Sequence, residues 1–454
     1  MHATRWISRS GLAFMLPALL PMASAQQGQP IAGYQLLTTV TIPGGLAGND
    51  ISWVDSANAR YYLADRGNAT ASPVIGPRVD VIDTQNNSFV TSIPLPAASN
   101  GILAIPRAHE LWVGLTNSTV AVIDTTTNGI THMISTGGTA RADEVAYDPE
   151  DRLILIANDL DTPPFVSFIS AANYSVVKKL NYDGVSAHKS TGGIEQPVWD
   201  DTTEMFYITI PATDVNPNGE IDELSPVTLG VTRTFPSTCK GPSGLALIPN
   251  QRLMTACGDV VDIVSGKVVT TVSGTGGDEI WYNAGDQRVY FGSGVNVPVV
   301  DANTYTLLTT LVVGQPAAAP LPAISTHSLA ADADNNEVLV AVAAAGTGTG
   351  TGVGIQIWRN GASLTAVPNP IPVTGGAVVG TATISWKAPN AQVIEVHIGS
   401  PSGALFTQDG NRGAMTTGAW VTDGMTFYLQ DVTGGKALTA ANTLATAVVH
   451  LQKM

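Results

Sequence analysis

Apolar and polar residues alternate along most of this chain in short runs that follow a repeated layout. In each unit, a pair of small or acidic residues precedes an apolar run, a polar turn and a second apolar run. Alternation with a period of two is typical of β-strands that bury one face. Three of the units read NDISWVDSANARYYLAD from residue 49, DEVAYDPEDRLILIAND from residue 143 and DEIWYNAGDQRVYFGSG from residue 278. We expect each unit to form an antiparallel hairpin.

A second hairpin follows each of these units at a variable distance. Examples are VDVIDTQNNSFVTSI at 79–93 and VAVIDTTTNGITHMI at 120–134, where Asp and Asn supply the turn. Two hairpins make a four-stranded antiparallel unit. The second residue of the leading pair falls at 50, 101, 144, 195, 244, 279 and 327, so the units recur every 35 to 51 residues. Seven four-stranded units at this spacing predict a seven-bladed β-propeller.

The ends of the repeat leave the closure of the ring open. Residues 34–42, YQLLTTVTI, resemble the outermost strands of the units but precede the first of them, so they are candidates to complete the last blade. The segment ASLTAV at 362–367 competes for the same place. After residue 367 the layout stops and a proline-rich linker follows. We predict an all-β protein, with a seven-bladed β-propeller at 26–367 followed by a small β-sandwich at 373–454.

The first 25 residues have the features of a signal peptide. Arg5 and Arg9 form a positively charged start, residues 11–22 are an apolar core, and Ala23-Ser24-Ala25 is a small-x-small cleavage pattern. The apolar core is short for a membrane span. We therefore expect a secreted or periplasmic protein that does not insert into a membrane.

Export makes a disulfide between Cys239 and Cys257 the expected state, because they are the two cysteines of the chain and the exported compartment is oxidising. Two free buried thiols are the alternative. The formal charge of −15, from 21 basic and 36 acidic residues without a basic cluster, argues against binding to nucleic acid.

The second residues of the leading pairs are the main candidate site. Innermost strands of a propeller line its central channel, so equivalent residues of all blades converge there. Five of these positions hold an acidic residue or a histidine: Asp50, Glu144, Glu195, Glu279 and His327. Bare carboxylates in a narrow channel repel one another, so we expect protonation or a bound divalent cation. Oxygen ligands suit Ca²⁺ or Mg²⁺, and the histidine also admits Mn²⁺, Fe²⁺ or Zn²⁺.

Two other interpretations of these positions stay open. Acidic residues at strand starts also cap turns or bond to the neighbouring blade. If instead the first residue of each pair faces the channel, the ring consists of Asn49, Asn100, Asp143, Ser243, Asp278 and Thr326.

The segment CKGPSGLALIPNQRLMTACGDVVDIVSGKVVTTVSGTGGDE at 239–279 resembles exported YncE/YVTN-type β-propeller proteins. That family repeats a small-residue, apolar, Asp-Pro, strand pattern that ends in a V-x-V-I-D turn. The resemblance covers roughly residues 34–367 and implies a binding scaffold, although the Tyr-Val-Thr-Asn tetrad itself is absent. The C-terminal segment resembles Ig-like or fibronectin-III-like modules of exported bacterial proteins.

The acidic ring is also similar to the metal-binding mouth of gluconolactonase-type propellers. That resemblance implies a divalent cation at Asp50, Glu144, Glu195, Glu279 and His327 that would polarise a lactone or ester carbonyl. No G-x-S-x-G, H-E-x-x-H or C-x-x-C motif occurs, which argues against ordinary hydrolase, zinc-protease and thiol-redox functions.

Three functions are consistent with the sequence. The preferred one is a monomeric exported propeller that binds a small molecule, glycan or protein ligand at its channel face without catalysis. The second is a metal-dependent lactonase, esterase or lyase that uses the channel residues. The third is a structural or adhesion protein of the cell envelope.

Overall fold

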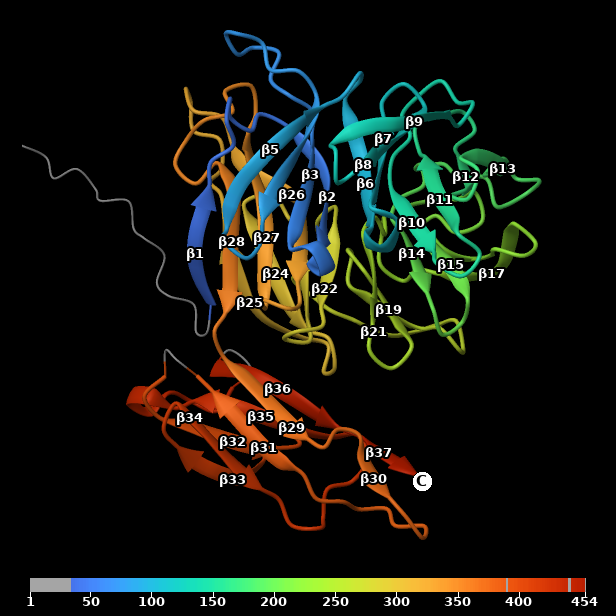
Figure 1. The fold of residues 1–454 in the computed structure, drawn as a ribbon. Helices are drawn as coiled ribbons and strands as arrows, with labels where there is room; N and C mark the ends of the chain where they lie inside the picture. Colours follow the sequence, from blue (N-terminus) through green and yellow to red (C-terminus); the bar gives the residue numbers. More distant parts are fainter. Residues whose placement is uncertain (1–33, 389–390, 440–441, 454) are drawn as a thin grey trace, which may run out of the picture.

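The computed structural model describes residues 34–388, 391–439 and 442–453, so the predicted signal peptide lies outside the described residues. Within these residues the chain forms seven four-stranded antiparallel sheets and a smaller C-terminal group of strands (Figure 1). Each innermost strand contacts the innermost strand of the next sheet, and the last contacts the first. The seven sheets therefore close into a ring, which confirms the predicted seven-bladed β-propeller.

The strands of each blade follow one another outward from the channel. Blades 1 to 3 contain β2 (Asn49–Asp55), β3 (Arg60–Asp65), β4 (Arg78–Asp83), β5 (Ser88–Pro94), β6 (Ser99–Ile105), β7 (Glu110–Leu115), β8 (Thr119–Asp124), β9 (Gly129–Ser135), β10 (Val145–Asp148), β11 (Leu153–Asn158), β12 (Phe165–Ser170) and β13 (Ser175–Asn181). Blades 4 to 6 contain β14 (Pro197–Asp200), β15 (Met205–Ile210), β16 (Glu220–Ser225), β17 (Gly230–Pro236), β18 (Leu245–Ile248), β19 (Arg252–Thr255), β20 (Asp259–Asp262), β21 (Lys267–Thr271), β22 (Ile280–Asn283), β23 (Arg288–Phe291), β24 (Asn296–Asp301) and β25 (Thr306–Val312).

The seventh blade combines strands from both ends of the propeller. It contains β26 (Ile324–Asp332), β27 (Glu337–Ala344), β28 (Gly354–Asn360) and, as the outermost strand, β1 (Tyr34–Val40). Strand β1 runs antiparallel to β28 (Figure 1). The segment at 34–42 therefore closes the ring.

Aspartates at strand ends explain why the hairpins turn where the sequence predicts. The Asp83 carboxylate accepts the backbone N–H groups of Gln85 at 3.0 Å and Asn86 at 2.8 Å. Asp124 accepts those of Thr126 at 2.7 Å and Thr127 at 3.1 Å. A short acceptor of this kind holds the chain in a tight turn before the next strand begins.

The hydrophobic cores of the propeller lie between blades. One cluster joins Leu103 and Trp112 of blade 2 to Ile154 and Ile156 of blade 3. Period-two alternation places these side chains on the sheet faces, where the neighbouring sheet covers them. Burying a side chain of this size contributes roughly 1.5–3 kcal/mol, so contacts between blades hold the ring together.

The predicted disulfide is present in blade 5. Cys239 precedes β18 and Cys257 follows β19, and their Cα atoms lie 5.8 Å apart. The bridge therefore ties the approach to the innermost strand to the end of the next strand. Within the described residues, no helix is long and apolar enough to cross a membrane.

The C-terminal strands form a small sandwich of two sheets. One sheet contains β29 (Ser363–Val367), β31 (Thr383–Lys387) and β34 (Arg412–Thr416). The other contains β32 (Ile394–Ile398), β33 (Ala404–Asp409), β35 (Met425–Asp431) and β36 (Thr443–Val449). A parallel pair, β30 (Ile371–Val373) and β37 (Leu451–Lys453), lies beside them.

The pairing of β29 places the boundary between the propeller and the sandwich earlier in the chain than the sequence analysis predicted. The sequence analysis placed residues 362–367 in the propeller. In the structure, β29 pairs with β31, and its Leu364 and Ala366 are buried in the core of the sandwich. The last propeller strand is β28, so the propeller ends near residue 360.

Buried polar contacts join the sandwich to blade 6. Arg288 is 2% exposed and donates to the Tyr34 hydroxyl at 2.8 Å and to the backbone oxygen of Leu444. The Thr446 hydroxyl donates to the Asp301 carboxylate at 2.5 Å. The sandwich therefore supplies partners for two charged side chains of the propeller.

Candidate functional site

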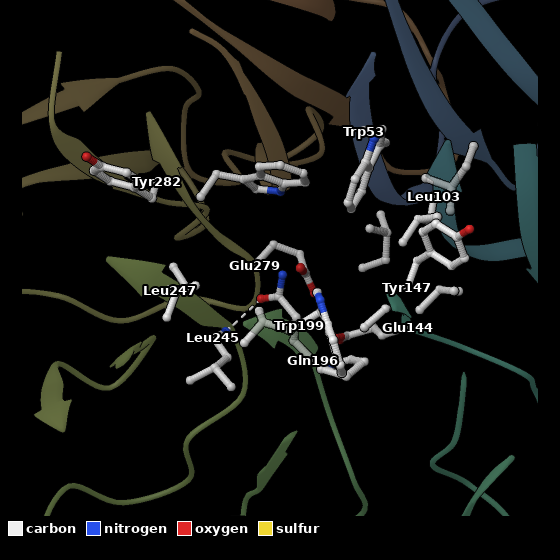
Figure 2. A pocket seen from close by; sticks show the side chains of 18 of the residues that line it. Trp53, Leu103, Glu144, Tyr147, Gln196, Trp199, Leu245, Leu247, Glu279 and Tyr282 are labelled. Carbon is white, nitrogen blue, oxygen red and sulfur yellow. Dashed lines mark hydrogen bonds between the residues drawn. The ribbon is translucent and has the colours of Figure 1, made fainter. Parts of the chain in front are cut away.

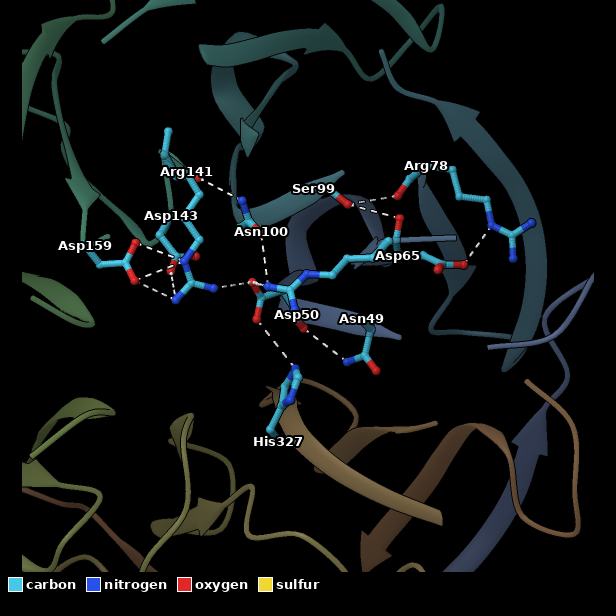
Figure 3. A network of polar contacts seen from close by, with 12 residues as sticks. Asn49, Asp50, Asp65, Arg78, Ser99, Asn100, Arg141, Asp143, Asp159 and His327 are labelled. Carbon is cyan, nitrogen blue, oxygen red and sulfur yellow. Dashed lines mark hydrogen bonds and ion pairs between the residues drawn. The ribbon is translucent and has the colours of Figure 1, made fainter. Parts of the chain in front are cut away.

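The structure places the five predicted ring residues in three groups along the channel. Asp50 and His327 form the first group, with 3.6 Å between the Asp50 Oδ1 and His327 Nε2 atoms (Figure 3). Arg66 forms an ion pair with the same carboxylate, and the Arg141 guanidinium lies 3.7 Å from it. Burial raises the pKa of Asp50, and the two arginines and His327 act against that shift.

Arg141 links several carboxylates close to Asp50. Its guanidinium binds Asp159 through two nitrogens, at 2.9 and 2.7 Å, and contacts Asp143 at 2.9 Å (Figure 3). Arg66 also donates to the side-chain oxygen of Asn100 at 3.0 Å. These arginines place positive charge where the sequence analysis expected a cation. Among the described residues, no three His, Cys, Asp or Glu side chains are grouped so that they could hold a metal ion.

Glu195 is the second group, and its carboxylate lies close enough to Glu144 and Glu279 to raise the pKa of both. It borders a cavity of about 620 Å³ together with Arg141, Asp159 and Lys189. Burial, together with the charges of Asp278 and Asp159, raises the pKa of Glu195 to about 8.

Glu144 and Glu279 are the third group, and their carboxyl groups are hydrogen-bonded to each other. Their exposed fractions are 4% and 1%. Burial, followed by the charges of nearby carboxylates, raises the pKa of both groups well above the usual range. Two carboxyls in contact in a buried site oppose a second negative charge, which adds to the upward shift of the pKa of both.

This carboxyl pair borders a cavity of about 400 Å³ that the innermost strands of six blades surround. Figure 2 shows the two glutamates at the centre of the view, with aromatic and aliphatic side chains around them. The wall is mainly apolar and includes five aromatic side chains: Trp53, Tyr147, Trp199, Trp281 and Tyr282. All five are only partly buried. The cavity therefore combines an apolar wall with buried carboxyl groups.

Bulges at the strand starts explain why neither predicted ring forms as a whole. The pairing register shifts at the beginning of β2, β6 and β26. A bulge breaks the alternation of side chains, so both residues of a leading pair can reach the channel. Asn100 accordingly joins the arginine network. Asp143, just before β10, also joins it, whereas Ser243 and Thr326 donate to backbone oxygens.

Two glycines leave gaps in the ring for a steric reason. A Cβ atom at Gly101 would lie 1.8 Å from the backbone oxygen of Asp143, and one at Gly244 would lie 2.3 Å from that of Asp278. Neighbouring innermost strands approach too closely there to admit a side chain.

The sequence analysis missed the aromatic wall, although the chain carries a signal for it. The first strands of blades 1, 3, 4 and 6 read ISW, VAY, PVW and IWY, so an aromatic residue recurs about three positions after the leading pair. Arg66 and Arg141 gave no comparable signal, because they come from different places in their blades and meet Asp50 only in the folded ring.

Comparison with known proteins identifies the fold and little more. No protein-family model matches the chain, and no curated protein matches it in sequence. Among solved structures, a chain from the crystal structure of a mitotic checkpoint complex matches it with a TM-score of 0.53. The sequence identity is 14%, and the match covers 78% of this chain and 99% of that chain. The fold is that of a β-propeller. At this identity the likeness concerns the fold alone.

Proposed function

We propose that the protein is an exported, non-enzymatic β-propeller that binds a small ligand in the aromatic cavity of its channel. The observation that carries the proposal is the cavity of about 400 Å³ beside Glu144 and Glu279. Ligand sites typically occupy about 300–1,000 Å³, with a mostly apolar wall and a few convergent polar groups. Partly exposed tryptophans around buried carboxyls fit that description.

Ligand binding at this site can be tested by thermal unfolding and tryptophan fluorescence against small molecules and oligosaccharides. A ligand at about 100 times its dissociation constant adds roughly 2.7 kcal/mol to the free energy of unfolding. The Trp199→Ala variant should lose this response, while Trp420→Leu in the C-terminal sandwich should keep it. A ligand whose effect is the same in both variants binds elsewhere, and that result would overturn the proposal.

A second candidate function is a hydrolase or lyase of the lactonase or esterase type, with or without a divalent cation. The observation that favours it is the buried pair Glu144 and Glu279, because burial raises the pKa of both carboxyls, and a carboxyl with a raised pKa is suited to act as a general acid. Turnover in a lactone and ester screen that Glu144→Gln abolishes would support this candidate. Loss of turnover on addition of a chelator would show that the reaction also needs a divalent cation.

The finer assignments from the sequence stay proposals of their own. We propose export through the signal peptide at residues 1–25, which the disulfide supports because such bridges persist in oxidising compartments. N-terminal sequencing of the exported protein should begin at Gln26. We also propose kinship with YncE-type propellers and an Ig-like or fibronectin-III-like class for the sandwich, on the sequence patterns given above.

A further inference from the structure

The cavity beside Glu144 and Glu279 has a charge that identifies the kind of ligand it would accept. Both glutamates are at least nine-tenths buried and border the cavity. None of the described residues that line the cavity is Lys, Arg or His. Carboxyl groups in an apolar surrounding without a cationic side chain favour a ligand that supplies positive charge.

The basic side chains of the channel bind carboxylates outside this cavity. Arg66, Arg141 and His327 gather around Asp50, and Arg141 also binds Asp143 and Asp159. The part of the channel beside Glu144 and Glu279 therefore has an excess of carboxyl groups, which favours cations over anions.

The aromatic wall supplies the second half of a cation site. The rings of Trp53 and Trp281 lie edge to face with their centroids 5.0 Å apart. Trp199, from blade 4, donates its indole N–H to Asp201 at 2.7 Å, which adds a carboxylate to the cavity lining. Aromatic faces attract ammonium groups, most strongly where water is excluded.

Resting on the function proposed above, we propose that the ligand is a small organic cation, an alkylammonium compound. Its ammonium group lies between the tryptophan side chains and the pair Glu144 and Glu279.

The test is calorimetric titration of the full chain with choline and with 3,3-dimethylbutan-1-ol, its neutral isostere. Choline should bind about tenfold tighter than the isostere, since the two differ only in charge. Glu279→Gln and Trp281→Leu should each weaken choline binding about tenfold, whereas Asp409→Asn and Trp420→Leu in the sandwich should leave it unchanged. Far-ultraviolet circular dichroism checks that each variant is folded.

The outcomes separate this inference from the proposed function. Equal binding of choline and the isostere, no effect of Glu279→Gln, or no binding of either probe would overturn the organic-cation assignment. If a neutral compound then responds to Trp199→Ala, the cavity still binds a ligand and only the assignment fails. If no compound responds, both proposals fail. If choline binds, tighter binding of an Nα-acetyl-trimethyllysine amide would assign the ammonium group to a protein side chain rather than to a small metabolite.

Discussion

The carboxyl of Glu195 makes the stability of the propeller depend on pH. Its pKa rises from 4.5 to about 8, first because of burial and then because of Asp278 and Asp159. The fold therefore favours the protonated form, and this contribution to stability is complete below about pH 4.5 and is lost as the pH rises through about 8. Glu195→Gln keeps the neutral state at every pH.

We expect Glu195→Gln to gain stability over the parent between about pH 5 and pH 8, by an amount on the order of 1–3 kcal/mol. Urea unfolding across that range measures the difference, with Asp409→Asn as the control. The same change of unfolding free energy with pH in the variant and the parent would contradict the raised pKa of Glu195.

Arg141 has the opposite role, since it compensates the charges of Asp50, Asp143 and Asp159. Arg141→Met should destabilise the propeller by on the order of 3 kcal/mol, because it leaves buried carboxylates without a counter-charge. Adding Asp159→Asn should restore part of that loss, since it removes one of those charges. Denaturant unfolding of the single and double variants measures the coupling, and strictly additive effects would mean that the two residues act independently.

A divalent cation at Asp50, Glu144, Glu195, Glu279 and His327 stays a prediction. If it is bound, chelator should lower the melting temperature and added Ca²⁺ or Mg²⁺ should restore it. Glu144→Gln should blunt that response, and Asp409→Asn should not. Elemental analysis of the purified protein without a stoichiometric metal, together with no effect of chelator, would leave the arginines as the counter-charges of the ring.

At the scale of single elements, the disulfide of blade 5 closes a loop between residues that are 18 apart in sequence. Chain entropy predicts about 3 kcal/mol of stabilisation for a loop of this length. The double variant Cys239→Ser, Cys257→Ser should lose about that amount in denaturant unfolding. Thiol titration of the denatured, unreduced parent should find no free thiol, and two free thiols would contradict the bridge.

Strands and turns were predictable from sequence because their signals are local. The apolar runs ISWVD and RYYLAD lie in the paired strands β2 and β3, and aspartates such as Asp83 and Asp124 hold turns after the strands that they end. The repeat then supplied the number of blades. Side-chain direction at the strand starts was not predictable, because the bulges in β2, β6 and β26 depend on contacts with neighbouring blades.

The candidate site was predictable only in part for the same reason. The repeat located the five ring positions at the channel, but their grouping depends on Arg66, which follows β3 in the same blade as Asp50, and on Arg141, which precedes β10 in blade 3. The strand at 363–367 was assigned to the wrong side of the boundary because its pattern is that of any half-buried strand. Only its pairing with β31 distinguishes the sandwich from the propeller.

At the scale of the whole molecule, the sandwich and the propeller share buried polar contacts. Arg288 bonds to Tyr34 of the closing strand and to the backbone of Leu444, and Asp301 accepts from Thr446. The residues that complete these contacts come from three distant parts of the sequence. The sandwich therefore contributes to the surroundings of the ring closure as well as forming a module of its own.

Removing the sandwich should consequently destabilise the propeller. A chain that ends at residue 367 keeps β29 without β31, so Leu364 and Ala366 become exposed, and Arg288 and Asp301 lose partners. Each buried polar group left without a partner costs roughly 1–3 kcal/mol. A chain that ends at residue 361 loses the same polar partners but carries no unpaired apolar strand.

We expect both shortened chains to melt below the full chain, and the chain ending at 367 to aggregate more readily than the one ending at 361. Calorimetry and light scattering measure the two effects. Arg288→Met in the full chain is the matched variant, because it removes the charge at the interface while keeping the sandwich, and it should fall between the parent and the shortened chains. A chain ending at 367 that stays soluble and melts with the parent would mean that the interface adds nothing to the stability of the ring.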